Sequence, residues 1–151
     1  MSITVLSILA LLSSYVSPVE CRLSPDSPFD IYGNICFEDE KAHLDNFAIT
    51  LEEDPNLIGY IVVYAGNESC AGEAQYRANR AKQWVLRRGI AAQRIIVKDG
   101  GYRTDVTTQL QPWPKDNPPY QILPGGLSIK EVKIFKRCVG KIYHPRKCPV
   151  R

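Results

Sequence analysis

The sequence predicts an α/β domain, and three observations lead to that fold class. Two short apolar runs, at residues 58–64 and 94–98, are rich in β-branched residues and have the length of buried strands. Two longer stretches, at 38–53 and 71–88, repeat apolar residues at helical spacing. Strands and helices therefore alternate along the chain, as they do when helices cover a sheet. We expect a two-layer sandwich with the element order β-α-β-α-β-β.

The first expected strand is Phe29 to Phe37, where apolar and polar residues alternate around a glycine. The next segment opens with three acids, Glu38 to Glu40, which the helix macrodipole favours in a first turn. Apolar residues then recur on one helical face, namely Leu44, Phe47, Ala48 and Leu51. Asp54 should end this helix because a residue before proline is pushed out of the α region.

The second strand, Ile58 to Tyr64, is apolar on both faces, so we expect it in the middle of the sheet. The second helix, Ala71 to Arg88, has a narrow face of small residues that permits a close approach to the sheet. Gly89 follows that helix directly, where a glycine commonly ends a helix in the left-handed conformation.

Two further strands complete the expected sheet. Arg94 to Lys98 is the third strand, and Asp99-Gly100-Gly101 is predicted to be a turn. Thr107 to Trp113 is the fourth strand, and Pro112 favours an edge position for it. The predicted domain therefore covers residues 29–113.

The rest of the chain is expected to be an extension outside this domain. Five of the 11 prolines lie between residues 112 and 124, which indicates an extended linker over 114–126. Residues 127–151 contain eight of the 19 lysines and arginines but a single acid, Glu131. The net charge is only +3, so a mildly acidic domain carries a basic C-terminal extension. Two short strands are expected to pair within residues 127–135.

The first residues are typical of a secretory signal peptide. Residues 3–12 are almost wholly apolar and lead into a polar segment, and this stretch is too short to span a bilayer. Basic residues that usually precede such a stretch are missing, and the alternative is a buried N-terminal helix. We expect residues 1–21 to be the signal peptide and 22–28 to be a Ser/Pro linker. The mature chain would then be exported, with no transmembrane segment.

Five cysteines are present, and cleavage after Cys21 leaves an even four, which suits an oxidising compartment. We expect Cys36 to pair with Cys70, because both lie where elements end on one side of the sheet. Cys138 and Cys148 enclose a short loop and should pair with each other. No closely spaced cysteine pair exists and the two histidines lie far apart in the sequence, so neither a metal site nor a cofactor is expected.

The residues that suggest a function are charged and follow the second strand. Glu68 lies in the loop after that strand, and Arg77 and Arg80 lie near the start of the second helix. An arginine can hold a carboxylate with two parallel hydrogen bonds, and a helix N-terminus adds donors. These residues could form an anion or zwitterion site, or they could belong to a solvated basic helix face. The sequence shows no set of nucleophile and base, so we expect no enzymatic activity.

Residues 29–103 resemble the OmpA-like domain of bacterial cell-envelope proteins. The resemblance rests on landmarks in the right order, namely Phe29-Asp30, Leu44-Asp45, an apolar strand and acidic loop at 61–68, Arg80-Ala81, Gly89-Ile90 and Arg94-Ile95. The resemblance implies a noncatalytic periplasmic domain that binds the peptide stem of peptidoglycan. By position, Glu68 replaces the family's aspartate, and Arg80 matches its arginine.

This chain also departs from the family pattern. Its acidic residue is a glutamate, the following loop is shorter and contains Cys70, and a later helix of the family is missing. Two kinds of function are therefore expected. One is an envelope module that binds peptidoglycan through the carboxylate and arginine. The alternative is a structural or interaction domain that keeps the fold without that site and binds another envelope protein. The basic extension favours acidic partners other than nucleic acid.

Overall fold

The structure is a computed structural model that describes residues 28–136. Its strands and helices are β1 (Asp30–Tyr32), α1 (Phe37–Glu53), β2 (Leu57–Ala65), β3 (Glu68–Cys70), α2 (Glu73–Arg87), β4 (Ile95–Tyr102), β5 (Thr107–Pro114) and β6 (Lys133–Phe135). The main sheet has four strands in the order β1-β5-β2-β4. Strand β2 is parallel to β4 and antiparallel to β5, and β5 is antiparallel to β1.

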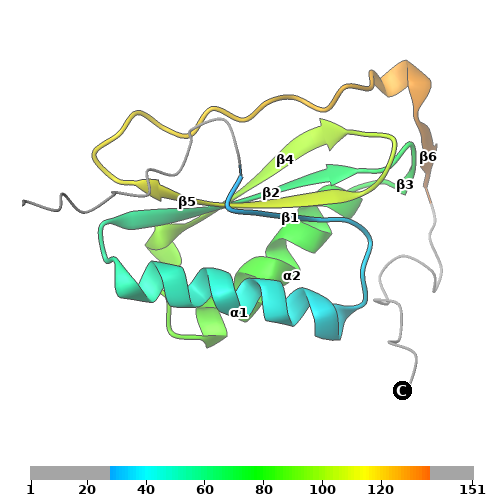
Figure 1. The fold of residues 1–151 in the computed structure, drawn as a ribbon. Coiled ribbons are helices and arrows are strands. Elements are labelled where there is room, and N and C mark those ends of the chain that lie inside the picture. The colour runs from blue at the N-terminus through cyan, green and yellow to red at the C-terminus, as the bar shows by residue number, and fades with distance from the viewer. Residues whose placement is uncertain (1–27, 137–151) are drawn as a thin grey trace, which may run out of the picture.

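The mixed α/β fold class is confirmed. Both long helices cover the same face of the main sheet, as Figure 1 shows. Alternate residues of β2, namely Ile61, Val63 and Ala65, enter the core between the sheet and the helices. They meet the apolar stripe predicted for the first helix, including Leu44 and Phe47, which are fully buried. The small-residue face of α2 packs against β2 and β4, since Ala74, Ala78 and Ala81 are buried there.

The first predicted strand is too long. Strand β1 ends at Tyr32, and Phe37 is the first residue of α1. The alternation of apolar and polar residues continues beyond the strand because Phe37 is also partly buried. Its ring packs against the half-buried Trp84 ring on α2, at 5.9 Å between ring centroids. Phe37, the first residue of the helix, therefore continued the alternating pattern and made the predicted strand too long.

The predicted turn at Asp99-Gly100-Gly101 is wrong, because β4 runs through it to Tyr102. Val63 pairs with Asp99 and Tyr64 with Gly101, so Gly100 is the extra residue of a β-bulge. A Cβ atom on Gly100 would lie 2.3 Å from a carbon of the Tyr64 ring, and Gly101 has a φ angle of +90°. The glycine pair lets the strand continue beneath a tyrosine ring and does not reverse the chain.

Strand β5 lies between β1 and β2, so its predicted edge position is wrong. Strand β1 pairs only with residues 108–110 of β5. Pro112 therefore lies beyond the end of β1 and pairs with β2 alone. A proline in an inner strand is tolerated where one neighbour has already ended.

Residues 115–127, here called the strap, are extended as predicted, but they pack against the sheet. They run over the sheet face opposite the helices (Figure 1). The Tyr120 ring lies 5.6 Å from the Tyr60 ring and 5.3 Å from the Trp113 ring, measured between centroids. The Tyr64 hydroxyl donates a hydrogen bond of 2.7 Å to the Leu123 carbonyl. The strap is thus a partial third layer and not a loose linker.

The end of the strap joins the bulged part of β4. The Gly125 amide donates to the Gly100 carbonyl at 2.8 Å, and the Leu127 amide donates to the Tyr102 carbonyl at 3.1 Å. A Cβ atom on Gly125 would lie 2.1 Å from the Tyr102 carbonyl oxygen. Only glycine permits this approach of two backbones.

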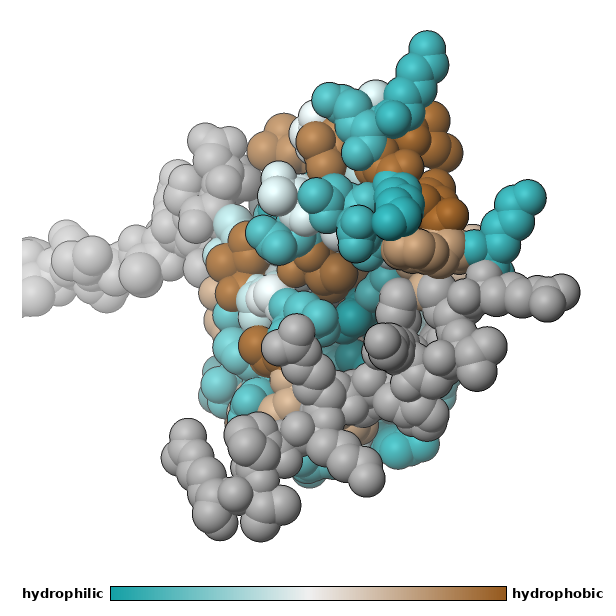
Figure 2. Space-filling view, turned by 90° about the vertical axis from the view of Figure 1, so that its right-hand side faces the viewer, coloured by the Kyte–Doolittle hydropathy of each residue, from teal (hydrophilic) through white to brown (hydrophobic). Residues whose placement is uncertain are grey.

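Strand β6 pairs in parallel with β3, with Glu68 opposite Lys133 and Cys70 opposite Phe135. The predicted strand pair within residues 127–135 is therefore wrong, since the partner of β6 comes from the domain. Hydrophilic and apolar residues mix on the β3/β6 end of the molecule, which faces the viewer in Figure 2. Residues 1–27 and 137–151 lie outside the described residues, so the signal peptide, its cleavage site, the 22–28 linker and the Cys138–Cys148 pair stay predictions.

Within residues 28–136, neither of the two long helices has both the length and the apolar character that a bilayer span requires.

Replacing Gly125 with alanine should detach the end of the strap. The added methyl group would overlap the Tyr102 backbone, and overpacking of this kind costs about 1–3 kcal/mol of unfolding free energy. Gly126→Ala is the matched control, because a Cβ atom there meets nothing within 4 Å. Denaturant unfolding and limited proteolysis of both variants would measure the difference. Equal behaviour of the two variants would show that the strap does not depend on this contact.

Candidate functional site

The structure separates the two residues that the sequence placed in one site. Glu68 begins β3 and is exposed, and its Oε1 atom lies 3.4 Å from the Lys133 Nζ atom. Arg80 lies on α2 and forms an ion pair with Glu40 of α1. Within residues 28–136, no hydrogen bond or ion pair joins Glu68 to Arg80. Each of the two residues therefore has its own charged partner in the structure.

Arg80 is part of a buried polar cluster. The Glu40 side chain is only 4% exposed, and one of its oxygens accepts a hydrogen bond from Arg80 Nη2. Its other oxygen accepts a hydrogen bond of 3.3 Å from the Tyr32 hydroxyl. Burial, and then the nearby Glu40 carboxylate, hold the pKa of Tyr32 well above its usual value. The cluster joins β1, α1 and α2 inside the protein.

The Arg80 guanidinium has few contacts besides Glu40. Its central carbon lies 4.9 Å from the centroid of the Phe37 ring. Its Nε atom is buried and has no hydrogen-bond acceptor in the described part of the chain. Glu40 therefore supplies the carboxylate that compensates the arginine charge, which makes this ion pair important for folding.

Arg77 belongs to a second buried ion pair. Its Nε atom donates to Glu73 Oε1 at 2.8 Å, and its Nη2 atom donates to Asn34 Oδ1 at 3.1 Å. The other oxygen of Glu73 accepts a hydrogen bond of 3.2 Å from the Cys70 amide. Arg77 and Glu73 thus connect the β1–α1 loop with the turn between β3 and α2.

The sequence contained a signal for one of these pairs. Glu73 and Arg77 are four residues apart on a helix, a spacing at which opposite charges commonly meet. Glu40 and Arg80 are 40 residues apart, and only the packing of α1 on α2 brings them together. Glu40 also lies in the first turn of α1, where acids are common, so the sequence does not indicate that it is the partner of Arg80.

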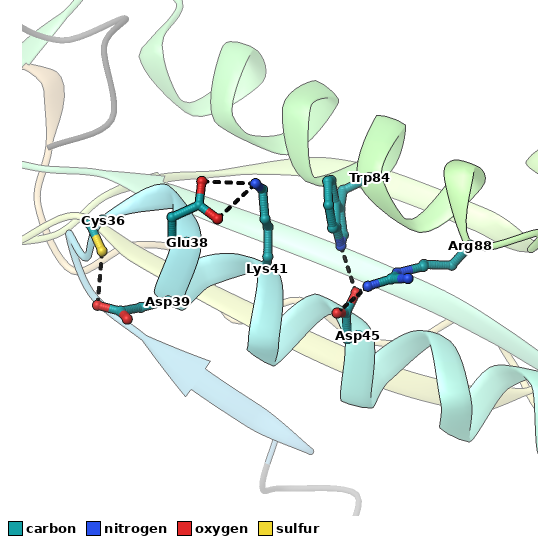
Figure 3. Close-up of polar contacts among 7 residues, drawn as sticks. All are labelled: Cys36, Glu38, Asp39, Lys41, Asp45, Trp84 and Arg88. Atoms are coloured by element: carbon teal, nitrogen blue, oxygen red, sulfur yellow. Dashed lines mark hydrogen bonds and ion pairs between the residues drawn. The ribbon is translucent and has the colours of Figure 1, made fainter. Parts of the chain in front are cut away.

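On the outer surface between α1 and α2, charged side chains lie around the Trp84 ring, as Figure 3 shows. Asp45 accepts hydrogen bonds of 2.7 Å from Trp84 Nε1 and from Arg88 Nε. The Arg88 guanidinium is the main reason that the pKa of Asp45 is lowered. Lys41 forms an ion pair with Glu38 at 2.8 Å and lies 4.8 Å from the Trp84 ring centroid.

Besides a cavity at Arg88, two surface cavities in the described part of the chain lie near arginines. One, of about 270 Å³, is lined by Phe37, Arg80, Gln83, Trp84 and Arg87. Two of its five lining residues are aromatic, and Arg80 in it is bound to Glu40. The other, of about 430 Å³, lies between the β4–β5 loop and the strap and includes Arg103. Neither cavity is indicated by a motif in the sequence.

Cys36 and Cys70 are both buried and both are disulfide-bonded. Cys36 precedes α1, where its sulfur lies 2.9 Å from Asp39 Oδ2 (Figure 3), and Cys70 ends β3. The Glu73–Arg77 pair connects the segments that carry these two cysteines. The pairing of Cys36 with Cys70 stays a prediction. Among residues 28–136, no three histidine, cysteine or acidic residues lie together as a metal site would require.

Comparison with known proteins adds no identification to this geometry. No family model matches the chain, and a search of curated proteins gives no match either.

Replacing Glu40 with glutamine should destabilise the protein strongly. The change leaves the Arg80 charge buried without a carboxylate, and breaking a buried pair in this way costs about 3–5 kcal/mol. Glu38→Gln is the matched control, since Glu38 lies two residues away and its ion pair at the surface contributes less than about 1 kcal/mol. Urea denaturation of both variants would measure the two losses. A small loss for Glu40→Gln would show that Arg80 does not need this partner.

A bond between Cys36 and Cys70 should appear in non-reducing peptide mapping of the purified chain. Such a bond closes a loop of moderate length and should stabilise the domain by roughly 3–4 kcal/mol. Peptides that join Cys36 or Cys70 to Cys138 or Cys148 would show that the pairing is wrong. The same map tests the predicted Cys138–Cys148 bond.

Proposed function

We propose that the chain is a noncatalytic interaction domain of the bacterial cell envelope, with an OmpA-like fold that lacks the carboxylate and arginine site for peptidoglycan. The observation that carries this proposal is the buried ion pair between Arg80 and Glu40. The arginine that would hold the peptide stem already holds an internal carboxylate. Arg77, the second candidate, is bound to Glu73 in the same way.

The ion pairs of Arg80 and Glu68 are evidence against ligand binding by these two residues. To bind a ligand carboxylate through the same contacts, Arg80 would have to give up Glu40, and an unpaired buried charge is costly. Glu68 is exposed, and its cationic neighbour is Lys133. The two residues thus have separate internal partners, which is the arrangement expected of structural residues.

The resemblance landmarks support the fold part of the proposal. Phe29-Asp30 leads into β1, and Arg94-Ile95 leads into β4. Gly89 follows α2 with a φ angle of +96°, the conformation in which a glycine ends a helix. These three landmarks lie where elements begin or end, so they belong to the fold more than to the binding of a ligand.

An exported location is part of the proposal. It is supported by the apolar segment at residues 3–12 and by the disulfide-bonded state of Cys36 and Cys70. We propose another envelope protein as the partner. The basic extension favours an acidic surface on it.

A sedimentation assay with purified peptidoglycan tests the proposal. The full chain should stay in the supernatant, and Glu68→Gln should behave like the unmodified protein. Glu53→Gln, an exposed glutamate at the end of α1, controls for the change in net charge. If the unmodified chain sediments with the wall and Glu68→Gln alone releases it, the residue pair binds peptidoglycan and the proposal is wrong.

A further inference from the structure

A shallow cavity, open to solvent, lies at the end of the sheet where the β4–β5 loop meets the strap. It has a volume of about 430 Å³ and is lined by Arg103, Thr104, Asp105, Thr107, Gly126 and Leu127. The backbone bonds of Gly125 and Leu127 to β4 fix the wall that the strap contributes. The cavity is thus lined by two segments, the β4–β5 loop and the end of the strap, which are distant in sequence and are held together by the fold.

Arg103 is held in place by a buried aromatic ring. Its guanidinium carbon lies 3.6 Å from the centroid of the Tyr64 ring, and its backbone amide donates to the Ala65 carbonyl at 2.9 Å. The Tyr64 hydroxyl is itself fixed by hydrogen bonds to Gln109 and Leu123. A guanidinium stacked on a fixed ring loses little freedom when it binds a planar anion.

The Arg103 charge has no acidic partner within residues 28–136, whereas Arg77, Arg80 and Arg88 are each paired with a carboxylate. Asp105 lines the same cavity, is exposed, and likewise has no cationic partner in the described part of the chain. Its backbone carbonyl accepts a hydrogen bond of 3.1 Å from the Thr107 hydroxyl. One cavity therefore contains one positive and one negative side chain, and neither is neutralised by an ion pair.

We propose that this cavity binds the zwitterionic group of an α-amino acid. Arg103 holds the carboxylate through its planar pair of donors, and Asp105 receives the ammonium group. The Thr104 and Thr107 hydroxyls lie at the cavity wall as further hydrogen-bonding groups. The volume exceeds what such a group needs, so the rest of the ligand extends towards solvent. This proposal goes beyond the interaction function proposed above and does not depend on it.

NMR titration of the full chain tests the proposal with four probes, added at constant pH and ionic strength. L-alanine carries both charges on one carbon. N-acetylalanine carries only the carboxylate, alaninamide carries only the ammonium, and dialanine carries both charges at a greater separation. Alanine should shift the backbone amide signals of residues 103–107 and bind more tightly than the other three probes. Stronger binding of dialanine would identify the free ends of a peptide as the ligand and overturn the assignment to a single amino acid.

Two variants test which side chain binds the carboxylate and which binds the ammonium group. Arg103→Gln and Asp105→Asn should each weaken alanine binding about tenfold, since each removes one charge-assisted contact. Asp105→Asn should leave N-acetylalanine binding unchanged, because that probe has no ammonium group. Arg87→Gln removes an exposed arginine on α2 and should leave all binding unchanged.

The thermal midpoint of each variant shows whether it is folded. Asp105 is exposed, so its variant keeps the test valid even if Arg103→Gln unfolds the protein. No shift of the residue 103–107 signals with alanine overturns the proposal, and so does an equal response of the Asp105→Asn variant. Either result leaves the peptidoglycan sedimentation test of the proposed function unaffected.

Discussion

The buried ion pairs of α2 are the interactions on which the rest of the fold depends. Glu40 and Glu73 are carboxylates placed inside a two-layer protein, where an isolated charge would be very unfavourable. Arg80 and Arg77 compensate them and at the same time reach β1, α1 and the β1–α1 loop. The packing of the helices on the sheet brings these opposite charges together.

Much of the fold follows from local patterns in the sequence. The apolar run of β2, the helical stripe of α1 and the stop at Gly89 depend on neighbouring residues, and each was predicted with nearly correct limits. The Gly100-Gly101 pair was mistaken for a turn because glycines serve both turns and bulges. What distinguishes the two is the Tyr64 ring, which comes from another strand and leaves no trace in the local sequence.

The candidate site was less predictable, because a charged residue acquires its role from the partner that the fold brings to it. Glu68 and Arg80 were placed together by position along the chain, whereas Lys133 and Glu40 are their neighbours in space. Arg103 and Asp105 lie two residues apart in an ordinary polar loop. They become candidates for ligand binding only in the structure, where neither forms an ion pair within residues 28–136 and the Tyr64 ring holds the arginine in place.

The strap has a consequence for the order in which the chain is made. The aromatic face of the sheet, with Tyr60 and Tyr64, is complete in sequence at Pro114, but its cover reaches as far as Leu127. At about 5–20 residues per second, a ribosome needs roughly one to three seconds to add the missing segment. During that interval a folded sheet would present tyrosine and tryptophan rings to solvent and to other nascent chains. Keeping the chain unfolded until synthesis is complete would avoid that exposure.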